Sequence, residues 1–220
     1  MTEIFSPLVE RAIETAAEWH DGTFRKGRWS PPVVVPPTDE PASQVPAMAH
    51  VTAVALTVQR AGWGDEAVAA AFLHDALEDA NRYRQRLARE VLVERVGEAV
   101  VAIVEAVSEP KTDDAGTMLP WRARKETYLE RLAAGPDESV AVSLADKLHN
   151  AYAMASSLAE GIDIFTSAPG RRALSAGPAD QRWFFEAVLG VSEDRSDARL
   201  VPMRARLREE VARFADLTED

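Results

Sequence analysis

Apolar residues recur at helical spacing along almost the whole chain, and this pattern most limits the folds available to it. A period of about 3.6 residues is typical of helices that bury one face against a core. Apart from the isolated Val33-Val34-Val35, no segment of useful length has the period of a β-strand. We therefore expect an all-α fold. The segments expected to be helical are residues 3–20, 47–61, 65–80, 84–108 (two helices broken near Gly97), 119–134, 137–159, 179–190 and 202–217.

Residues 27–46 interrupt this pattern with a dense run of prolines (Pro31, Pro32, Pro36, Pro37, Pro41 and Pro46). Proline lacks a backbone N–H and restricts the preceding residue, so the segment is expected to be extended rather than helical. The 26 residues before it are too few for an independent core, which favours a loop within the domain over a linker. A long loop of this kind is either a surface excursion or a lid over a site.

Length, charge and composition exclude several classes of protein. The 220 residues are most simply one domain, residues 1–220. A net charge of −11 argues against nucleic acid or an anionic membrane as partner. There is no signal peptide and no apolar run near the ~20 residues that span a bilayer, so the cytoplasm is the default compartment. Cysteine is absent, which excludes a disulfide, a thiolate metal site and a cysteine nucleophile.

An unusual group of ionisable residues interrupts the apolar helical segment 65–80. His74, Asp75, Glu78 and Asp79 lie on one side of that helix at about 100° per residue. A solvated acidic helix end is the ordinary explanation. Buried charge is costly unless it is paired or binds a metal ion, and the adjacent His-Asp pair after Ala-Ala-Phe-Leu therefore favours a metal site.

Four residues form a candidate metal site: His50, His74, Asp75 and Asp146. Two imidazoles and two carboxylates suit Mn²⁺, Fe²⁺, Co²⁺ or Zn²⁺, whereas Ca²⁺ and Mg²⁺ more often take oxygen ligands alone. The four lie on three expected helices, and converging helices commonly build such sites in a bundle. The remaining histidines are expected to be structural, His20 as the cap of the first helix and His149 either packing or orienting Asp146.

These residues occur in segments that resemble the HD-domain metallophosphohydrolases. The match is to the (p)ppGpp hydrolase branch, which comprises the hydrolase domain of the bifunctional stringent-response enzymes and their small single-domain relatives. The resemblance implies an HD-domain helical bundle with its core motifs in residues 16–150 and C-terminal helices in 179–217. The segments that carry it are Trp19–Lys26, the helix with His50, Ala71–Asp79, Leu144–Asn150 and, downstream, Trp121–Lys125 and Gln181–Phe185.

The resemblance also implies a role for each matching residue. The activity would be release of 3′-pyrophosphate from ppGpp or pppGpp, with a small nucleotide as the substrate. The metal ligands would be His50, His74, Asp75 and Asp146, which would bind Mn²⁺ or another divalent transition metal. Glu78 and Asp79 would be the catalytic acidic pair. Arg25 and Lys26 would contact the nucleotide, Lys147 would offset its charge, and Asn150 would lie at the ribose.

One segment departs from the family pattern and keeps other functions open. Twenty-four residues separate Arg25 from His50, where the family has a short turn, and Ala47-Met48-Ala49 replaces the usual aromatic residue. The alternatives are an HD-type nucleotidase or phosphohydrolase acting on another small nucleotide, and a nucleotide-binding module without turnover. A purely structural helical protein would leave the clustered carboxylates unexplained.

Overall fold

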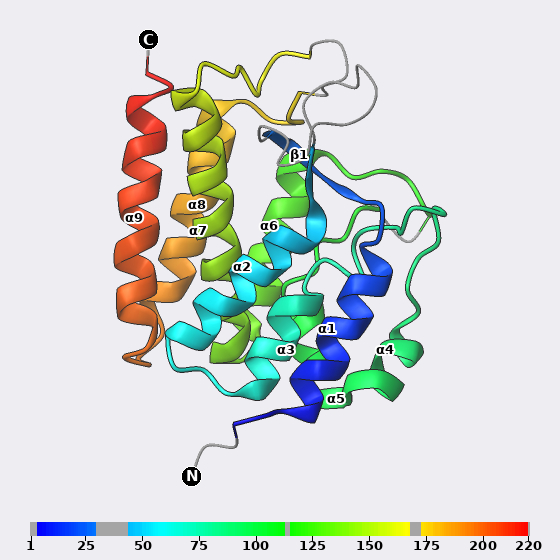
Figure 1. Ribbon diagram of the computed structural model, residues 1–220. Coiled ribbons are helices and arrows are strands. Elements are labelled where there is room, and N and C mark those ends of the chain that lie inside the picture. The colour runs from blue at the N-terminus through cyan, green and yellow to red at the C-terminus, as the bar shows by residue number, and fades with distance from the viewer. Residues whose placement is uncertain (1–3, 30–43, 113–114, 168–172, 220) are drawn as a thin grey trace.

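The computed structural model describes residues 4–29, 44–112, 115–167 and 173–219, and this part is built almost entirely from helices (Figure 1). The expected all-α class is confirmed. The helices are α1 (Pro7–Trp19), α2 (Ala47–Arg60), α3 (Asp65–Leu73), α4 (Arg89–Val96), α5 (Glu98–Ala106), α6 (Trp121–Ala134), α7 (Asp137–Ala159), α8 (Pro178–Glu193) and α9 (Leu200–Asp216).

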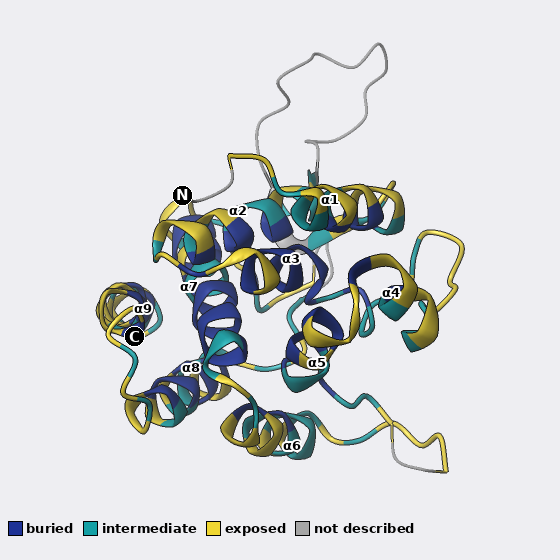
Figure 2. Cartoon of the chain, turned by 90° about the horizontal axis from the view of Figure 1, so that it is seen from below, coloured by how far each residue is buried: buried dark blue, intermediate teal, exposed yellow. Residues whose placement is uncertain are grey.

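Helix α7 runs through the bundle with helices on several sides of it, while α1 and α4 lie farther out, beyond α3 and α5 (Figure 2). It packs against α2, α3, α5, α6, α8 and α9. Residues 139–147 of α7 are buried without interruption, because apolar and small side chains there meet neighbours on every side. Asp146 and Lys147 end this buried stretch. Burying the charges of Asp146 and Lys147 costs free energy unless other polar groups interact with them, and the neighbouring helices supply such groups.

Glycine and proline set most helix boundaries where the sequence predicts them. Helices α4 and α5 are separated at Gly97, whose φ of +85° favours glycine over residues with a side chain. The predicted bounds of α7 are the observed ones, and it follows Gly135-Pro136. No helix in the described ranges is both long and apolar enough to cross a membrane.

The prediction of one helix over residues 65–80 was wrong, because α3 ends at Leu73 and turns follow it. The Ala76 N–H donates to the Leu73 carbonyl at 2.9 Å, which closes a tighter turn than an α-helix. Side chains from distant segments then bind the backbone carbonyls: Trp19 Nε1 donates to Asp79 at 2.9 Å and Lys111 Nζ to Glu78 at 3.0 Å. These tertiary hydrogen bonds replace helical ones, and local periodicity does not reveal them.

A small antiparallel sheet was not predicted. Strand β1 (Phe24–Trp29) pairs with β2 (Gln44–Pro46), with Phe24 opposite Pro46 and Trp29 opposite Gln44. The two ends of the proline-rich segment 27–46 are therefore strands, while residues 30–43 lie outside the described part of the chain, as does Val33-Val34-Val35. Strand β1 also contacts α7 and so brings the Arg25 segment to the central helix.

Candidate metal centre and the surrounding pocket

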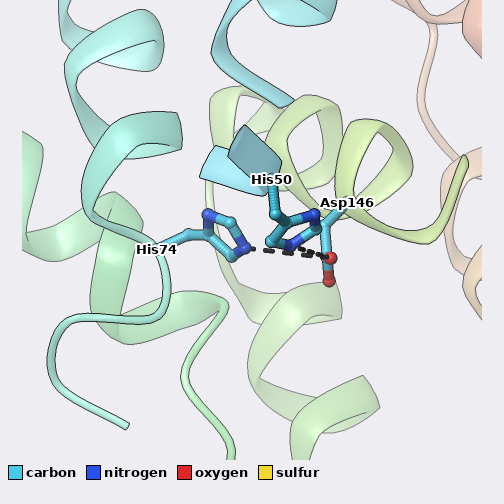
Figure 3. Close-up of side chains that lie close together, drawn as sticks. All are labelled: His50, His74 and Asp146. Atoms are coloured by element: carbon cyan, nitrogen blue, oxygen red, sulfur yellow. Dashed lines mark ion pairs between the residues drawn. The ribbon is translucent and has the colours of Figure 1, made fainter. Parts of the chain in front are cut away.

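Three side chains from three different segments meet inside the bundle (Figure 3). His50 lies in α2, His74 directly follows α3, and Asp146 lies in α7. Asp146 Oδ1 is 3.1 Å from His50 Nε2 and 3.8 Å from His74 Nε2. All three residues are buried, and their potential ligand atoms lie within 4.8 Å of one another. The fold thus brings two nitrogen donors and one oxygen donor together at one point.

This donor set fits a divalent transition metal. Ligand atoms bound to one ion at about 2.1 Å lie roughly 3.0–3.4 Å from each other, close to the separations seen here. His74 Nδ1 is 2.8 Å from the Ala71 carbonyl, so Nδ1 carries a proton and Nε2 is the atom left to bind an ion. Within the described part of the chain, His74 Nε2 is buried without a hydrogen-bond partner. A cation between these donors would satisfy it.

Asp75, the fourth predicted ligand, lies at the edge of the three-residue group. Its carboxylate oxygens are 3.3 Å from His74 Nε2 and 3.8 Å from His50 Nε2. Its side chain is 30% exposed, against 10% for Asp146. The structure therefore brings the four predicted ligand residues together, with three enclosed and Asp75 more accessible.

Electrostatics of the centre favour a cation. Burial disfavours the charged form of His74, but the carboxylates of Asp75 and Asp146 outweigh it and raise its pKa to about 9. Burial likewise opposes ionisation of Asp146, yet Lys147 and the two histidines hold its pKa well below the ordinary value. His50 differs, because burial and the nearby Arg25 guanidinium lower its pKa and keep it neutral.

The Asp146 carboxylate is held in place from its own helix. Asn150, one turn later, donates to Asp146 Oδ1 at 2.6 Å, and Lys147 Nζ contacts Oδ2. Asn150 Oδ1 in turn accepts a hydrogen bond from Arg25 Nη2 at 2.7 Å. Two residues expected at the substrate therefore also form a chain of hydrogen bonds that ends on a candidate metal ligand.

Glu78 and Asp79 lie in the turns after α3 and line the same cavity as the candidate metal ligands. Lys111 Nζ is 2.8 Å from Asp79 Oδ1 and 3.5 Å from Glu78 Oε1, and so bridges the two carboxylates. Glu78 Oε2 also accepts a hydrogen bond from the Glu109 N–H at 3.2 Å. Burial, followed by the nearby Asp75, raises the pKa of Glu78, while Lys111 opposes the rise. Sequence reasoning missed Lys111, which lies between helices where no periodicity marks it.

A cavity of about 290 Å³ joins these groups. His50, His74, Asp75, Glu78, Asp79 and Asp146 all line it, as do Arg25, Lys147 and Asn150. The backbone of Lys26 is part of β1, but its side chain lies outside the described part. Of the four predicted substrate contacts, three are therefore placed at one cavity together with the candidate metal ligands.

One wall of the cavity carries a further cation, Lys125, beside the predicted substrate contact Lys147. The ammonium groups of Lys125 and Lys147 lie 4.5 Å and 5.0 Å from the centre of the Phe184 ring. Buried Glu109 pairs with Lys125 and with Arg124, the latter at 2.6 Å. Burial and the neighbouring Lys147 lower the pKa of Lys125. Lys125 pairs with Glu109 and Lys147 with Asp146, so this wall carries two ammonium groups, each beside a carboxylate.

The two remaining histidines behave differently from each other. His20 is the C-cap of α1, as expected, and its N–H donates to the Ala16 carbonyl at 2.9 Å. His149 was expected to pack or to orient Asp146. Its Nδ1 instead lies 2.9 Å from His50 Nδ1, and the two rings are 4.8 Å apart at 50°. Lys147 and Asn150 already hold the Asp146 carboxylate, which leaves His149 to contact the candidate ligand His50.

Comparisons with known proteins give one family and several similar structures. A family model described as HD domain matches residues 35–166. The structure is similar to that of lmo0812 from Listeria monocytogenes EGD-e, with a TM-score of 0.60 and 25% identity over 76% of this chain and 93% of that chain. It is also similar to a metazoan ortholog of SpoT that hydrolyses ppGpp, with a TM-score of 0.58 and 19% identity over 98% and 97% of the two chains. No curated protein matched the sequence.

Proposed function

Because this chain belongs to the HD domain family, we propose that it is a metal-dependent hydrolase that removes 3′-pyrophosphate from guanosine polyphosphates. One observation carries the proposal: the His50, His74 and Asp146 group shares a cavity with an acidic pair and with several cations. A metal site beside carboxylates, in a pocket that arginine and lysine side chains also line, suits hydrolysis of a phosphate ester. A purely structural role for the protein would leave this charged cavity unexplained.

We propose that His50, His74, Asp75 and Asp146 hold the metal ion, with Mn²⁺ as the first choice. The mixed imidazole and carboxylate donors are compatible with Mn²⁺ but do not select it over Fe²⁺, Co²⁺ or Zn²⁺. When bound, such an ion polarises a phosphate oxygen and lowers the pKa of a water molecule.

Glu78 is proposed as the general base, with Asp79 orienting the attacking water. Burial raises the pKa of Glu78, which makes its carboxylate a stronger proton acceptor than an exposed glutamate. In the reaction the water oxygen bonds to phosphorus, the bond from that phosphorus to the ribose O3′ breaks, and O3′ takes up a proton. Lys111 is proposed to hold Glu78 and Asp79 in place during this step.

The rest of the cavity suits a nucleotide with phosphates at more than one position. Arg25 and Asn150 line the cavity, as do Lys125 and Lys147, so more than one cation can meet the negative charge of the ligand. The structural similarity to a metazoan SpoT ortholog extends over 98% of this chain and supports one hydrolase domain over residues 1–220. We propose a cytoplasmic location for the enzyme.

A second candidate function is hydrolysis of another small nucleotide. The observation behind it is the 24-residue separation of Arg25 from His50, which lengthens the connection beside Arg25. Different segments would then carry catalysis and base selection. A nucleotide-binding module without turnover is the third candidate, and the presence of Glu78 and Asp79 in the cavity argues against it.

A product-release screen with Mn²⁺-loaded protein tests the assignment. The substrates are ppGpp, pppGpp, NADPH and simple nucleoside phosphates, with pyrophosphate and phosphate measured separately. We expect pyrophosphate release from ppGpp or pppGpp, abolished in the Asp146→Asn variant and retained in Asp180→Asn, a change at an exposed position of α8. Rapid turnover of another substrate without turnover of guanosine polyphosphates would support the second candidate. Tight nucleotide binding without any turnover would support the third.

A further inference from the structure

His74 and His50 present the same nitrogen to the candidate metal centre, but different groups hold their other nitrogen. The Nε2 atoms of both rings face Asp146 Oδ1. His74 Nδ1 faces the Ala71 carbonyl at 2.8 Å, and a carbonyl only accepts hydrogen bonds. His74 is therefore fixed by its own backbone with the proton on Nδ1. His50 Nδ1 faces the His149 ring.

The contact between His50 and His149 requires one ring to donate and the other to accept. Their Nδ1 atoms are 2.9 Å apart, and two neutral imidazoles can share only one proton across that gap. If His149 donates, the proton of neutral His50 is on Nε2, which then blocks metal binding. If His149 accepts, His50 Nδ1 carries the proton and its Nε2 lone pair is free for a metal. The role of His149 in this hydrogen bond thus decides whether His50 can be a ligand.

The position of His149 follows from the helix that also supplies Asp146. The two residues are three apart in α7, so both face the same side of the helix, toward α2. Lys147 and Asn150 hold the two oxygens of Asp146, and His149 contacts the ring of His50. One short stretch of α7 therefore provides a candidate ligand and contacts that orient both that ligand and another.

We propose that His149 is a positioning residue that accepts a hydrogen bond from His50 Nδ1–H and so keeps His50 Nε2 available to the metal ion. The inference rests on the proposed metal site but not on the choice of substrate. Hydrogen bonds to the second nitrogen of a metal-binding histidine fix its tautomer and ring orientation, and their loss typically weakens metal binding by roughly 10–100-fold.

Two substitutions of similar size separate hydrogen bonding from packing. In His149→Asn the side-chain oxygen can occupy the place of Nδ1 and accept the hydrogen bond, whereas His149→Leu fills similar space without an acceptor. Tyr152→Leu, at an exposed position of the same helix, is the control. The affinity for Co²⁺ and Mn²⁺ alone is measured by competition with a chromophoric chelator, and the visible spectrum of bound Co²⁺ reports the ligand geometry.

We expect His149→Leu to lose about 10–100-fold in metal affinity with an altered Co²⁺ spectrum, and His149→Asn to recover most of both. Equal losses in the two variants, or affinity in His149→Leu equal to that of the unmodified protein, would overturn the proposal. No metal binding by the unmodified protein would overturn the metal site itself. Turnover is not needed for any of these results, so a wrong substrate does not affect them.

Nitrogen-15 NMR of the imidazoles provides a test that does not depend on a variant folding. The unmodified protein is loaded with Zn²⁺, which is diamagnetic, and the protonation of each ring nitrogen is read from its chemical shift. We expect the proton on Nδ1 of His50 and on Nε2 of His149. A proton on His149 Nδ1 in the zinc-loaded protein would contradict the inference.

Discussion

Asn150 donates a 2.6 Å hydrogen bond to Asp146 one turn earlier in α7, and this bond links the nucleotide side of the cavity to the candidate metal centre. Arg25 donates to the same Asn150 side chain from β1. A group expected to contact the ribose is therefore also a partner of a candidate metal ligand. We therefore expect substrate binding and metal retention to be coupled through Arg25, Asn150 and Asp146.

Replacing Asn150 tests this coupling. Asn150→Leu removes a hydrogen bond to a charged carboxylate, a contact worth about 1.5–3 kcal/mol. We expect two effects in this variant: metal affinity falls by roughly 10-fold or more, and KM rises. Chelator competition and steady-state kinetics measure the two effects, with the exposed Gln59→Leu change as control. A rise in KM at unchanged metal affinity would limit Asn150 to the nucleotide.

The acidic pair after α3 is expected to serve the chemical step rather than metal binding. Glu78→Gln and Asp79→Asn should each lower kcat by about 10²–10⁴-fold, because they remove a proton acceptor or a water-orienting group. Metal content, measured by elemental analysis, and the melting temperature should stay near those of the unmodified protein. The exposed Glu90→Gln change in α4 is the matched control. Near-normal turnover in both single variants would remove this pair from the mechanism.

Lys111 should control the acidic limb of the pH–rate profile. Glu78 acts as a base only when ionised, so activity is present above its raised pKa and is lost as pH falls through that value. Lys111 lowers this pKa by stabilising the carboxylate. Lys111→Met should therefore move the acidic limb of kcat/KM to higher pH, and Lys111→Arg should largely restore it. If the acidic limb of kcat/KM stays at the same pH in Lys111→Met, a group other than Glu78 is responsible for it.

The buried stretch of α7 should dominate stability as well as the site. Leu144, two residues before Asp146, is fully buried, and Leu144→Ala should cost about 2–5 kcal/mol in the free energy of unfolding because it leaves a cavity. Leu56→Ala, at a 43% exposed position of α2, should cost about 1 kcal/mol or less. Urea titration of both variants measures the difference. Equal losses in the free energy of unfolding for the two variants would mean that the bundle repacks around α7.

Most of the helices and the identity of the candidate ligands were predictable because the signals for both are local. Apolar spacing marked the helices, and Gly97 and Gly135-Pro136 marked where several of them end or begin. The chemistry of two histidines and two aspartates suggested a metal site before any geometry was known. The adjacent His74-Asp75 pair is the local part of that signal, as apolar spacing, glycine and proline are for the helices.

Contacts between distant segments decided the remainder. Trp19 and Lys111 bind the carbonyls of Asp79 and Glu78, and the chain there forms turns although its apolar pattern continued as a helix. Pairing with β2 made a strand of the Arg25 segment, for which the sequence predicted no strand. His149 faces His50 rather than Asp146 because α2 packs against α7. Periodicity records which side of a helix is buried, but only the packed structure shows which residue lies opposite.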